Sequence, residues 1–285
     1  MLSVRNLSKA YGAEHALRNV SLSIVPGDGL IALLGANGSG KSTLLRVLAT
    51  AIPPDSGEIS FARHSYAGDL RPVRQLIGYL PQALDLPGTL TAFKVLHYLA
   101  RLKGVPDRVE SLKLLDALGL SALADKPLSQ LSSGQLRMVG IAQALIGNPR
   151  LLLLDECLRG LDTHERERVI RLLRTRSTET VTLFSSHVPA EVERIAARVI
   201  VLAHGSVLFA GEVSALTAQA AGCVYELRID ARELSGVMQH LTISRVQRQG
   251  DQAVLRVMST HPLPNGVLVP PTLEDAYLLQ VICAR

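Results

Sequence analysis

The sequence predicts an α/β fold built on a mixed, largely parallel β-sheet, with a helical subdomain and a small C-terminal α+β domain. Three observations predict it. Short apolar runs alternate with helical patterns along most of the 285 residues. A glycine-rich segment at residues 35–43 separates one apolar run from a helix. Apolar residues make up 47 % of the chain, which is ample material for a core.

Short apolar runs supply the expected sheet. A bounded run of four or five apolar residues is typical of a buried strand. Such runs occur at residues 30–34, 77–80, 151–154, 181–184 and 199–202. Residues 41–50 and 164–175 have helical spacing and lie between them. Residues 2–7 and 20–24 precede this alternation, and we expect them to form an antiparallel layer.

Two segments differ from this pattern. Between Thr91 and Gly147 only helical periodicity remains, so we expect a helical subdomain at about residues 84–147. Beyond residue 220 strand alternation returns, and a hairpin is expected around Gly250-Asp251. The predicted domains are therefore residues 1–220 and 221–285.

Composition and charge exclude several classes of protein. The formal net charge of +5 is dispersed, which favours an ordinary solvated surface over a nucleic-acid or acidic-lipid site. Cys157, Cys223 and Cys283 are too few and too scattered for a disulfide framework or a zinc site. No run approaches the ~18 apolar residues of a membrane-spanning helix, and residues 1–7 lack the core of a signal peptide. We therefore expect a cytoplasmic protein.

The glycine-rich segment carries the strongest chemical signal. It matches the phosphate-binding loop pattern G-x-x-x-x-G-K-[ST] and lies between an apolar run and a helix, the context that this loop requires. Its glycines let backbone N–H groups approach phosphate oxygens, Lys41 can reach a triphosphate, and the Ser42 hydroxyl can bind Mg²⁺. The full segment is Gly35, Ala36, Asn37, Gly38, Ser39, Gly40, Lys41, Ser42 and Thr43.

Two carboxylates end the apolar run at residues 151–154. Asp155 and Glu156 follow it directly, so a buried strand would deliver both to the carboxyl edge of the sheet. Asp155 is placed to hold magnesium through water, and Glu156 is placed to take a proton from an attacking water. Such a pair alone is more often an exposed strand end; together with the phosphate loop it favours function.

A second helix start is able to bind an anion. Ser132, Ser133, Gly134 and Gln135 open an apolar helix that is expected to run to Ile146. In isolation Ser132 would be an ordinary N-cap. A head-to-tail dimer gives this segment a ligand, because it would then cover the phosphate bound by the other protomer.

Five motifs, in this order and spacing, resemble those of the ATP-binding cassette (ABC) ATPases. They are the phosphate loop, the glutamine loop with Gln82, the Leu-Ser-Ser-Gly-Gln segment, the strand that ends in Asp-Glu, and the histidine at position 187. The resemblance covers about residues 1–215, and its Leu-Ser-x-Gly-Gln element is highly specific to that family. It implies that Tyr11 stacks on adenine and that Gln82 contacts Mg²⁺ and water. It also implies that Asp162 belongs to a loop crossing the dimer interface and that His187 hydrogen-bonds the γ-phosphate. Read alone, Tyr11, Gln82 and His187 would be structural residues at strand ends.

The chain departs from the family pattern at three places. Cys157-Leu158 follows Glu156 where the family usually has Pro-Thr, so the loop behind the carboxylate and the turnover rate are the features open to change. Ser133 replaces a usual glycine, and Thr163 stands where proline is common. Cys157 has no basic partner that the sequence can place beside it, so no nucleophilic role is expected.

The resemblance also implies cofactors and partners. ATP and Mg²⁺ are the expected cofactors, and a homodimer or a pair with a second ABC subunit is the expected assembly. The segment from Ser186 to Arg194, in which Val188 follows the histidine, and the segment from Pro271 to Leu278 resemble ATPases paired with ABC-2-type export permeases. We therefore expect a separate polytopic permease, a peripheral position on the inner face of the cell membrane, and no nucleic acid. A soluble ABC ATPase acting on nucleic acid or ribosomes, and a non-hydrolysing nucleotide-gated module, remain the alternatives.

Overall fold

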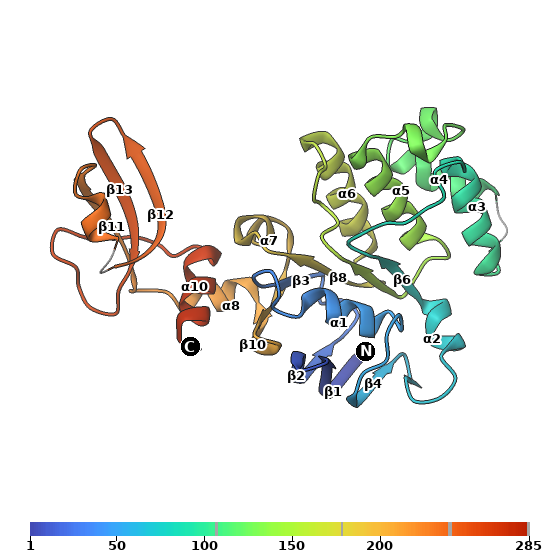
Figure 1. The fold of residues 1–285 in the computed structure, drawn as a ribbon, viewed down its shortest axis with the longest axis horizontal. Coiled ribbons are helices and arrows are strands. Elements are labelled where there is room, and N and C mark those ends of the chain that lie inside the picture. Colours follow the sequence, from blue (N-terminus) through green and yellow to red (C-terminus); the bar gives the residue numbers. More distant parts are fainter. Residues whose placement is uncertain (106–107, 178, 239–240, 284–285) are drawn as a thin grey trace.

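The computed structural model describes residues 1–105, 108–177, 179–238 and 241–283. Its centre is a six-stranded sheet with the strand order β10-β9-β3-β8-β7-β6 (Figure 1). Neighbouring strands are parallel except for β9 and β10, which are antiparallel. The mixed α/β core is thus confirmed. The strands are β3 (Leu30–Leu34), β6 (Ile77–Leu80), β7 (Leu151–Leu154), β8 (Val181–Ser186), β9 (Arg198–Ala203) and β10 (Ser206–Glu212).

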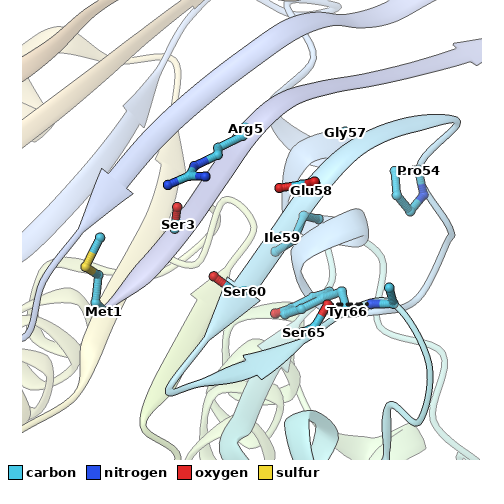
Figure 2. A pocket seen from close by; sticks show the side chains of 11 residues that line it. Met1, Ser3, Arg5, Pro54, Gly57, Glu58, Ile59, Ser60, Ser65 and Tyr66 are labelled. Atoms are coloured by element: carbon cyan, nitrogen blue, oxygen red, sulfur yellow. Dashed lines mark hydrogen bonds between the residues drawn. The ribbon is translucent and has the colours of Figure 1, made fainter.

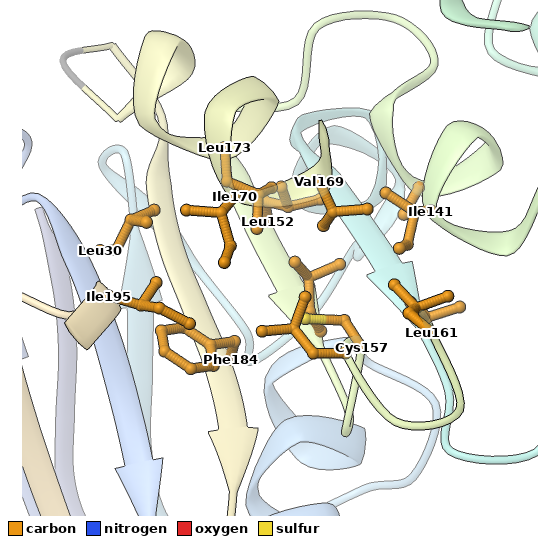
Figure 3. Packing of buried hydrophobic residues seen from close by; sticks show 14 of the residues in the cluster. Leu30, Ile141, Leu152, Cys157, Leu161, Val169, Ile170, Leu173, Phe184 and Ile195 are labelled. Atoms are coloured by element: carbon orange, nitrogen blue, oxygen red, sulfur yellow. The ribbon is translucent and has the colours of Figure 1, made fainter. Parts of the chain in front are cut away.

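Both faces of the central sheet are covered, which explains why its strands are continuously apolar. In β3, Ile31 and Leu33 face one hydrophobic cluster, whereas Leu30, Ala32 and Leu34 face another. The first cluster joins the sheet to helix α1 (Lys41–Leu48) and to the antiparallel layer. The second joins it to the remaining core helices, and Figure 3 shows part of it between the sheet and α6 (Thr163–Arg176).

The expected antiparallel layer is a four-stranded sheet with the order β2-β1-β4-β5. It confirms the strands predicted at residues 2–7 and 20–24 and extends them to a turn at Gly12. Its strands are β1 (Leu2–Tyr11), β2 (Glu14–Ile24), β4 (Ser56–Phe61) and β5 (His64–Ser65), and helix α2 (Arg71–Leu76) follows them.

Among the described residues of the middle of the chain the elements are helices, as expected, with one isolated β-bridge between Thr91 and Pro127. Three of them pack against one another and are linked by two short 3₁₀ turns. They are α3 (Ala92–Leu102), α4 (Arg108–Ala117) and α5 (Ser133–Leu145); the core also has α7 (Pro189–Ile195) and α8 (Val213–Ala218). None of the helices in the described ranges has the length and apolarity needed to cross a membrane.

A third sheet lies to one side of the core (Figure 1). Its strand order is β12-β13-β11-β14, and β12 and β13 form the hairpin expected at Gly250-Asp251. Its elements are β11 (Val224–Asp230), α9 (Leu234–Val237), β12 (Thr242–Gln249), β13 (Gln252–Met258) and β14 (Val267–Leu268). Leu234, Ala253, Leu255 and Val257 form a small hydrophobic cluster of their own.

The last helix, α10 (Leu273–Cys283), returns to the core and contacts α7 and α8. Leu273 belongs to the main hydrophobic cluster, and its backbone N–H donates to Glu193 Oε1 at 3.0 Å. Two ion pairs tie the start of α10 to the third sheet: Arg256 with Asp275 at 2.8 Å and Arg245 with Glu274 at 3.1 Å. Helix α10 therefore joins the third sheet to the core, and the division into domains at residue 220 stays a prediction.

Candidate functional site

Four loops meet at one edge of the central sheet. Strands β3, β8, β7 and β6 are adjacent and parallel, so the loops that follow them lie side by side at their carboxyl ends. These loops carry the phosphate-loop segment, His187, Glu156 and Gln82. A cavity of about 290 Å³ lies there, lined by Tyr11, Glu14, Ala16, Asn37, Gly38, Gly40, Lys41, Ser42, Thr43, Gln82 and Glu156.

Glycine is required at two points of the phosphate loop. A Cβ on Gly35 would come within 2.4 Å of the Leu202 carbonyl oxygen. A Cβ on Gly40 would come equally close, 2.4 Å, to the Ala16 carbonyl oxygen, and Gly40 has a φ of 105° that other residues rarely adopt. The loop therefore bends tightly against β9 and β2 before α1 begins at Lys41.

Lys41 is buried beneath this loop. Its ammonium donates to the carbonyl oxygens of Gly35 at 2.7 Å and Ala36 at 2.8 Å. Burial lowers the pKa of Lys41, while the negative charges of Glu156 and Asp155 act to raise it. A buried cation whose hydrogen bonds go to neutral carbonyls would be stabilised by an anionic ligand in the cavity.

Asp155 does not line this cavity; it is buried behind the cavity wall. Asp155 is only 1 % exposed, and Ser185 Oγ donates a hydrogen bond to its Oδ1 at 2.6 Å. The same hydroxyl accepts from the Glu156 backbone N–H at 2.8 Å. Ser185 thus fixes both acidic residues from the next strand, a role that the sequence analysis missed.

In the part of the chain that the structure describes, three side chains lie against the Glu156 carboxylate. Arg159 Nη1 donates to its Oε2 at 2.9 Å, and Gln82 Nε2 reaches the same oxygen at 3.4 Å. His187 Nδ1 lies 3.4 Å from Oε1. Burial acts to raise the pKa of Glu156, but the hydrogen bond and charge of Arg159, with smaller contributions from His187 and Gln82, leave this pKa below its usual value.

A second cavity, of about 400 Å³, shares part of its wall with the first. Both are lined by Asn37, Gln82 and Glu156, and the second adds His187 and the loop around Arg159. Most of the predicted phosphate-loop residues, together with Gln82, Glu156 and His187, therefore line two cavities that share part of their walls.

Arg137 of α5 holds the loops behind this hollow, and the sequence analysis missed it. Its guanidinium donates to the carbonyl oxygens of Pro81 at 3.1 Å, Gln82 at 2.7 Å, Asp155 at 2.6 Å and Glu156 at 2.8 Å. One buried side chain therefore fixes the backbone on both sides of the site. An arginine inside an otherwise apolar helical stretch is the sequence signal that points to such a role.

The remaining predicted residues lie elsewhere in this protomer. Ser132 is the N-cap of α5 and Asp162 is the N-cap of α6, each completed as a capping box by the residue three positions on. The segment of Ser132, Ser133, Gly134 and Gln135 lines neither cavity, and neither does Asp162. The ordinary N-cap is thus what the structure shows at Ser132 and Asp162.

Cys157 packs into the core beside the site (Figure 3). It is 1 % exposed, and burial raises the pKa of its thiol to about 12 despite the opposing charge of Arg137. Arg137 is a basic neighbour that the sequence could not place, but burial outweighs it. A thiol that stays protonated is a poor nucleophile, as expected.

A larger hollow lies away from the sheet edge. It has a volume of about 610 Å³ and is formed on β1, β4 and β5, among them Ser3, Arg5, Glu58 and Tyr66 (Figure 2). None of the predicted site residues lines it. Volume alone therefore does not mark the functional site, whereas the meeting of the four loops does.

Comparison with known proteins agrees with this geometry. Residues 17–159 match the family model of the ABC transporter. The chain is also 32 % identical to the uncharacterized ABC transporter ATP-binding protein YxlF of Bacillus subtilis, over 98 % of this chain and 98 % of that protein. The chain belongs to the ABC transporter family. It is an ATP-binding subunit of that family and is therefore an ABC ATPase.

Other relatives of this ABC subunit are named for transport in opposite directions, export and import. It is 34 % identical to the Nod factor export ATP-binding protein I of Sinorhizobium fredii, covering 97 % of this chain and 84 % of that protein. It is 32 % identical to the methionine import ATP-binding protein MetN of Brucella abortus, covering 90 % and 71 %. Among solved structures, a dimeric ATP-binding cassette in a post-hydrolysis state with ADP and Pi is similar, with a TM-score of 0.68, 29 % identity, and coverage of 74 % and 98 %.

Proposed function

We propose that this ABC subunit uses ATP hydrolysis to power export by a separate membrane permease. The observation that carries the hydrolytic part is that Lys41 and Glu156 line the same cavity, with a cation for phosphate on one side and a carboxylate for water on the other. Residues 1–220 would form the ATP-binding domain, with the helical subdomain at 84–147, and residues 221–285 a small C-terminal domain whose last helix, α10, packs back on the first domain.

ATP fits the first cavity by its chemistry. Phosphate oxygens would accept from Lys41 and from the backbone of residues 35–43, at the start of α1, where the helix dipole also favours an anion. The exposed ring of Tyr11 at the rim of the cavity would stack on adenine. The buried Ser39 hydroxyl has no partner among the described residues, which also suits a loop shaped for a ligand.

The donor set also fits Mg²⁺. Ser42 and Gln82 line the first cavity and offer hydroxyl and amide oxygens, and the buried Asp155 carboxylate behind the wall would act on the ion through water. Mg²⁺ prefers such ligands together with substrate phosphates and water. Among the described residues no cluster of three or more His, Cys, Asp or Glu side chains could hold a metal ion. When bound, Mg²⁺ would neutralise charge on the phosphate oxygens.

Glu156 would be the general base. Its carboxylate accepts a proton from water while the water oxygen bonds to the γ-phosphorus, and the bond from that phosphorus to the bridging oxygen of ADP breaks. ADP and inorganic phosphate are the products. His187, beside Glu156 at 3.4 Å, would donate a hydrogen bond to the γ-phosphate.

A head-to-tail dimer would complete each site. Ser132, Ser133, Gly134, Gln135 and Asp162 line neither cavity of their own protomer, so we propose that they bind the nucleotide held by a partner. The partner is a second copy or another ABC subunit. The dimeric state of the related solved cassette supports this assembly.

The direction of transport rests on sequence features. Val188 directly follows His187, and residues 271–278 resemble the end of ATPases that serve ABC-2-type export permeases. The similarity to a Nod factor export protein agrees, although an import protein is similar as well. The permease would contact residues 83–90, and the subunit would then lie on the inner face of the membrane.

Substitution of Glu156 tests the hydrolytic role. Glu156→Gln should lower the turnover of ATP by about 10²–10⁴-fold, because the amide cannot accept the proton, while ATP still binds. Glu167→Gln, on the surface in an ion pair with Arg194, is the matched control and should keep full turnover. ATPase assays and ATP-binding titrations on both variants, with and without a co-expressed permease, decide the point. Unchanged turnover in Glu156→Gln would refute the assignment.

Purification tests the partner. The tagged chain, solubilised from membranes in mild detergent, should be recovered with a polytopic protein, and its ATPase rate should rise with that protein present. Recovery with ribosomes or nucleic acid instead would refute the transport role.

A further inference from the structure

A short turn presents His187 at the end of β8. The Ser186 hydroxyl accepts a hydrogen bond from the Val188 backbone N–H at 3.1 Å, which closes a turn with His187 at its centre. The Val188 carbonyl oxygen accepts from the backbone N–H groups of Glu191 at 3.1 Å and Val192 at 3.2 Å, at the start of α7. The residues on both sides of His187 are therefore fixed by hydrogen bonds, whereas His187 itself is exposed.

Glu191 sets the direction of this serine hydroxyl. A hydroxyl has one proton to donate, and Ser186 Oγ donates it to Glu191 Oε2 at 2.8 Å. The lone pairs of the hydroxyl oxygen are then free to face the Val188 N–H, so the bond that closes the turn is kept. Removal of the carboxylate would take away the bond that holds the hydroxyl in this rotation.

Arg166 of α6 holds the other oxygen of the same carboxylate. Its Nη1 donates to Glu191 Oε1 at 2.8 Å, and its Nη2 reaches the Leu158 carbonyl oxygen at 3.4 Å, in the loop that follows Glu156. The Glu191 side chain is only 15 % exposed, and bonds from both a guanidinium and a hydroxyl fix its orientation. The network thus joins α6 and α7 to the end of β8, and its three side chains line the second cavity.

We propose that Glu191 is a positioning residue for ATP hydrolysis, which acts through Ser186 to hold His187 where it meets the γ-phosphate. This rests on the proposed hydrogen bond from His187 to that phosphate. A group that stabilises the transition state must be in place before the reaction, and a misplacement of about 1 Å can cost about 10²-fold in rate. Glu191 touches neither the phosphate nor the attacking water; it fixes the turn that carries the histidine.

A second ion pair between the same two helices provides a matched comparison. Arg194 of α7 donates to Glu167 Oε1 of α6 at 2.8 Å, and the Glu167 side chain is 50 % exposed. In the part of the chain that the structure describes, this pair makes no bond to the turn of His187. If Glu191 served only to tie α6 to α7, the loss of either glutamate would have the same kind of effect.

ATPase assays on variants of the full chain, at a range of ATP concentrations, test this proposal. Glu191→Ala should lower kcat by about 10-fold with little change in KM, because it weakens a contact made in the transition state. Ser186→Ala keeps the ion pair of Glu191 but breaks the same link, so it should reproduce the loss; it also decides the point if Glu191→Ala does not fold. Glu167→Ala, the control, should keep the wild-type kcat. In a His187→Ala background, Glu191→Ala should cause no further loss, because the two residues act as one unit.

A spectroscopic measurement does not depend on turnover. The ring signals of His187 can be followed by NMR in histidine-labelled protein and assigned by their loss in His187→Ala. They should shift or broaden in Glu191→Ala and Ser186→Ala and stay as in wild type in Glu167→Ala. Wild-type kcat in Glu191→Ala, unchanged ring signals, or an equal further loss in the His187→Ala background overturns the proposal. Full turnover in His187→Ala would instead overturn the role of His187 itself, so the two failures are distinguishable.

Discussion

Replacing Asp275 by alanine should weaken the attachment of the third sheet to α10 more than any nearby surface change. Asp275 is fully buried, and it accepts from Ser244 Oγ at 2.6 Å, Arg256 Nε at 2.8 Å, and Thr272 N and Oγ1, both at 2.8 Å. The carboxylate therefore caps α10 and pairs with β13 at the same time. Its loss leaves the guanidinium of Arg256 without its closest carboxylate.

The magnitude follows from this burial. Removing one partner of a buried ion pair costs about 3–5 kcal/mol, because the other charge remains desolvated. With a urea m-value of about 3 kcal/mol/M, the midpoint of unfolding should fall by about 1–1.7 M. The matched control is Glu274→Ala, which breaks an ion pair with the exposed Arg245 and should cost about 0–1 kcal/mol.

Urea unfolding followed by far-ultraviolet circular dichroism measures the difference, since the chain has no tryptophan to report by fluorescence. The pH dependence provides a second check. Burial acts to raise the pKa of Asp275, but hydrogen bonds from Ser244, Thr272 and Arg256 leave this pKa lowered. Its stabilisation is thus present above the unfolded value and is lost as the pH falls through the lower folded pKa. A midpoint in Asp275→Ala no lower than in Glu274→Ala would refute this reasoning.

Two further predictions concern the site. Gly40→Ala should weaken ATP binding by at least about 5-fold, because a positive φ costs a non-glycine residue about 1–2 kcal/mol and the new Cβ would meet the Ala16 carbonyl. Gly68→Ala, also at a positive φ but in open space, should bind ATP as wild type in calorimetric titrations, and equal affinities of the two variants would contradict the steric argument. In the native protein, iodoacetamide at pH 8 should modify the exposed Cys283 and not Cys157, because burial raises the pKa of the Cys157 thiol to about 12. Mass spectrometry of the labelled protein before and after unfolding measures the difference. Labelling of Cys157 in the native protein would disprove its burial.

The part of the fold that the sequence predicts well is the part fixed by local pattern. Five consecutive apolar residues in β3 indicate a strand with both faces covered, and the clusters on its two sides confirm this. The phosphate loop can be predicted because its backbone conformation requires glycine at fixed positions, as the positive φ of Gly40 shows. Adjacent parallel strands then explain why Gln82 and Glu156, far apart in the chain, line one cavity.

Contacts between distant segments are the part that pattern does not reveal. Arg137 is an isolated polar residue in an apolar helix until the loops after β6 and β7 are placed against it. Ser185 likewise matters only because β8 lies beside β7. The pairing of Arg159 with Glu156 depends on side-chain directions in a loop, for which one sequence gives no rule.

The chain leaves the core for the third sheet and returns to the core at the same place. The backbone N–H of Val269 donates to the Val224 carbonyl at 3.0 Å, so the two ends of the excursion touch, and α10 then resumes the core. In topology the sheet is thus an insertion rather than a tail. Shortening the chain from its C-terminus removes core helix before any strand of the sheet, whereas a short linker from residue 224 to residue 269 would bypass the sheet and leave α10 in place.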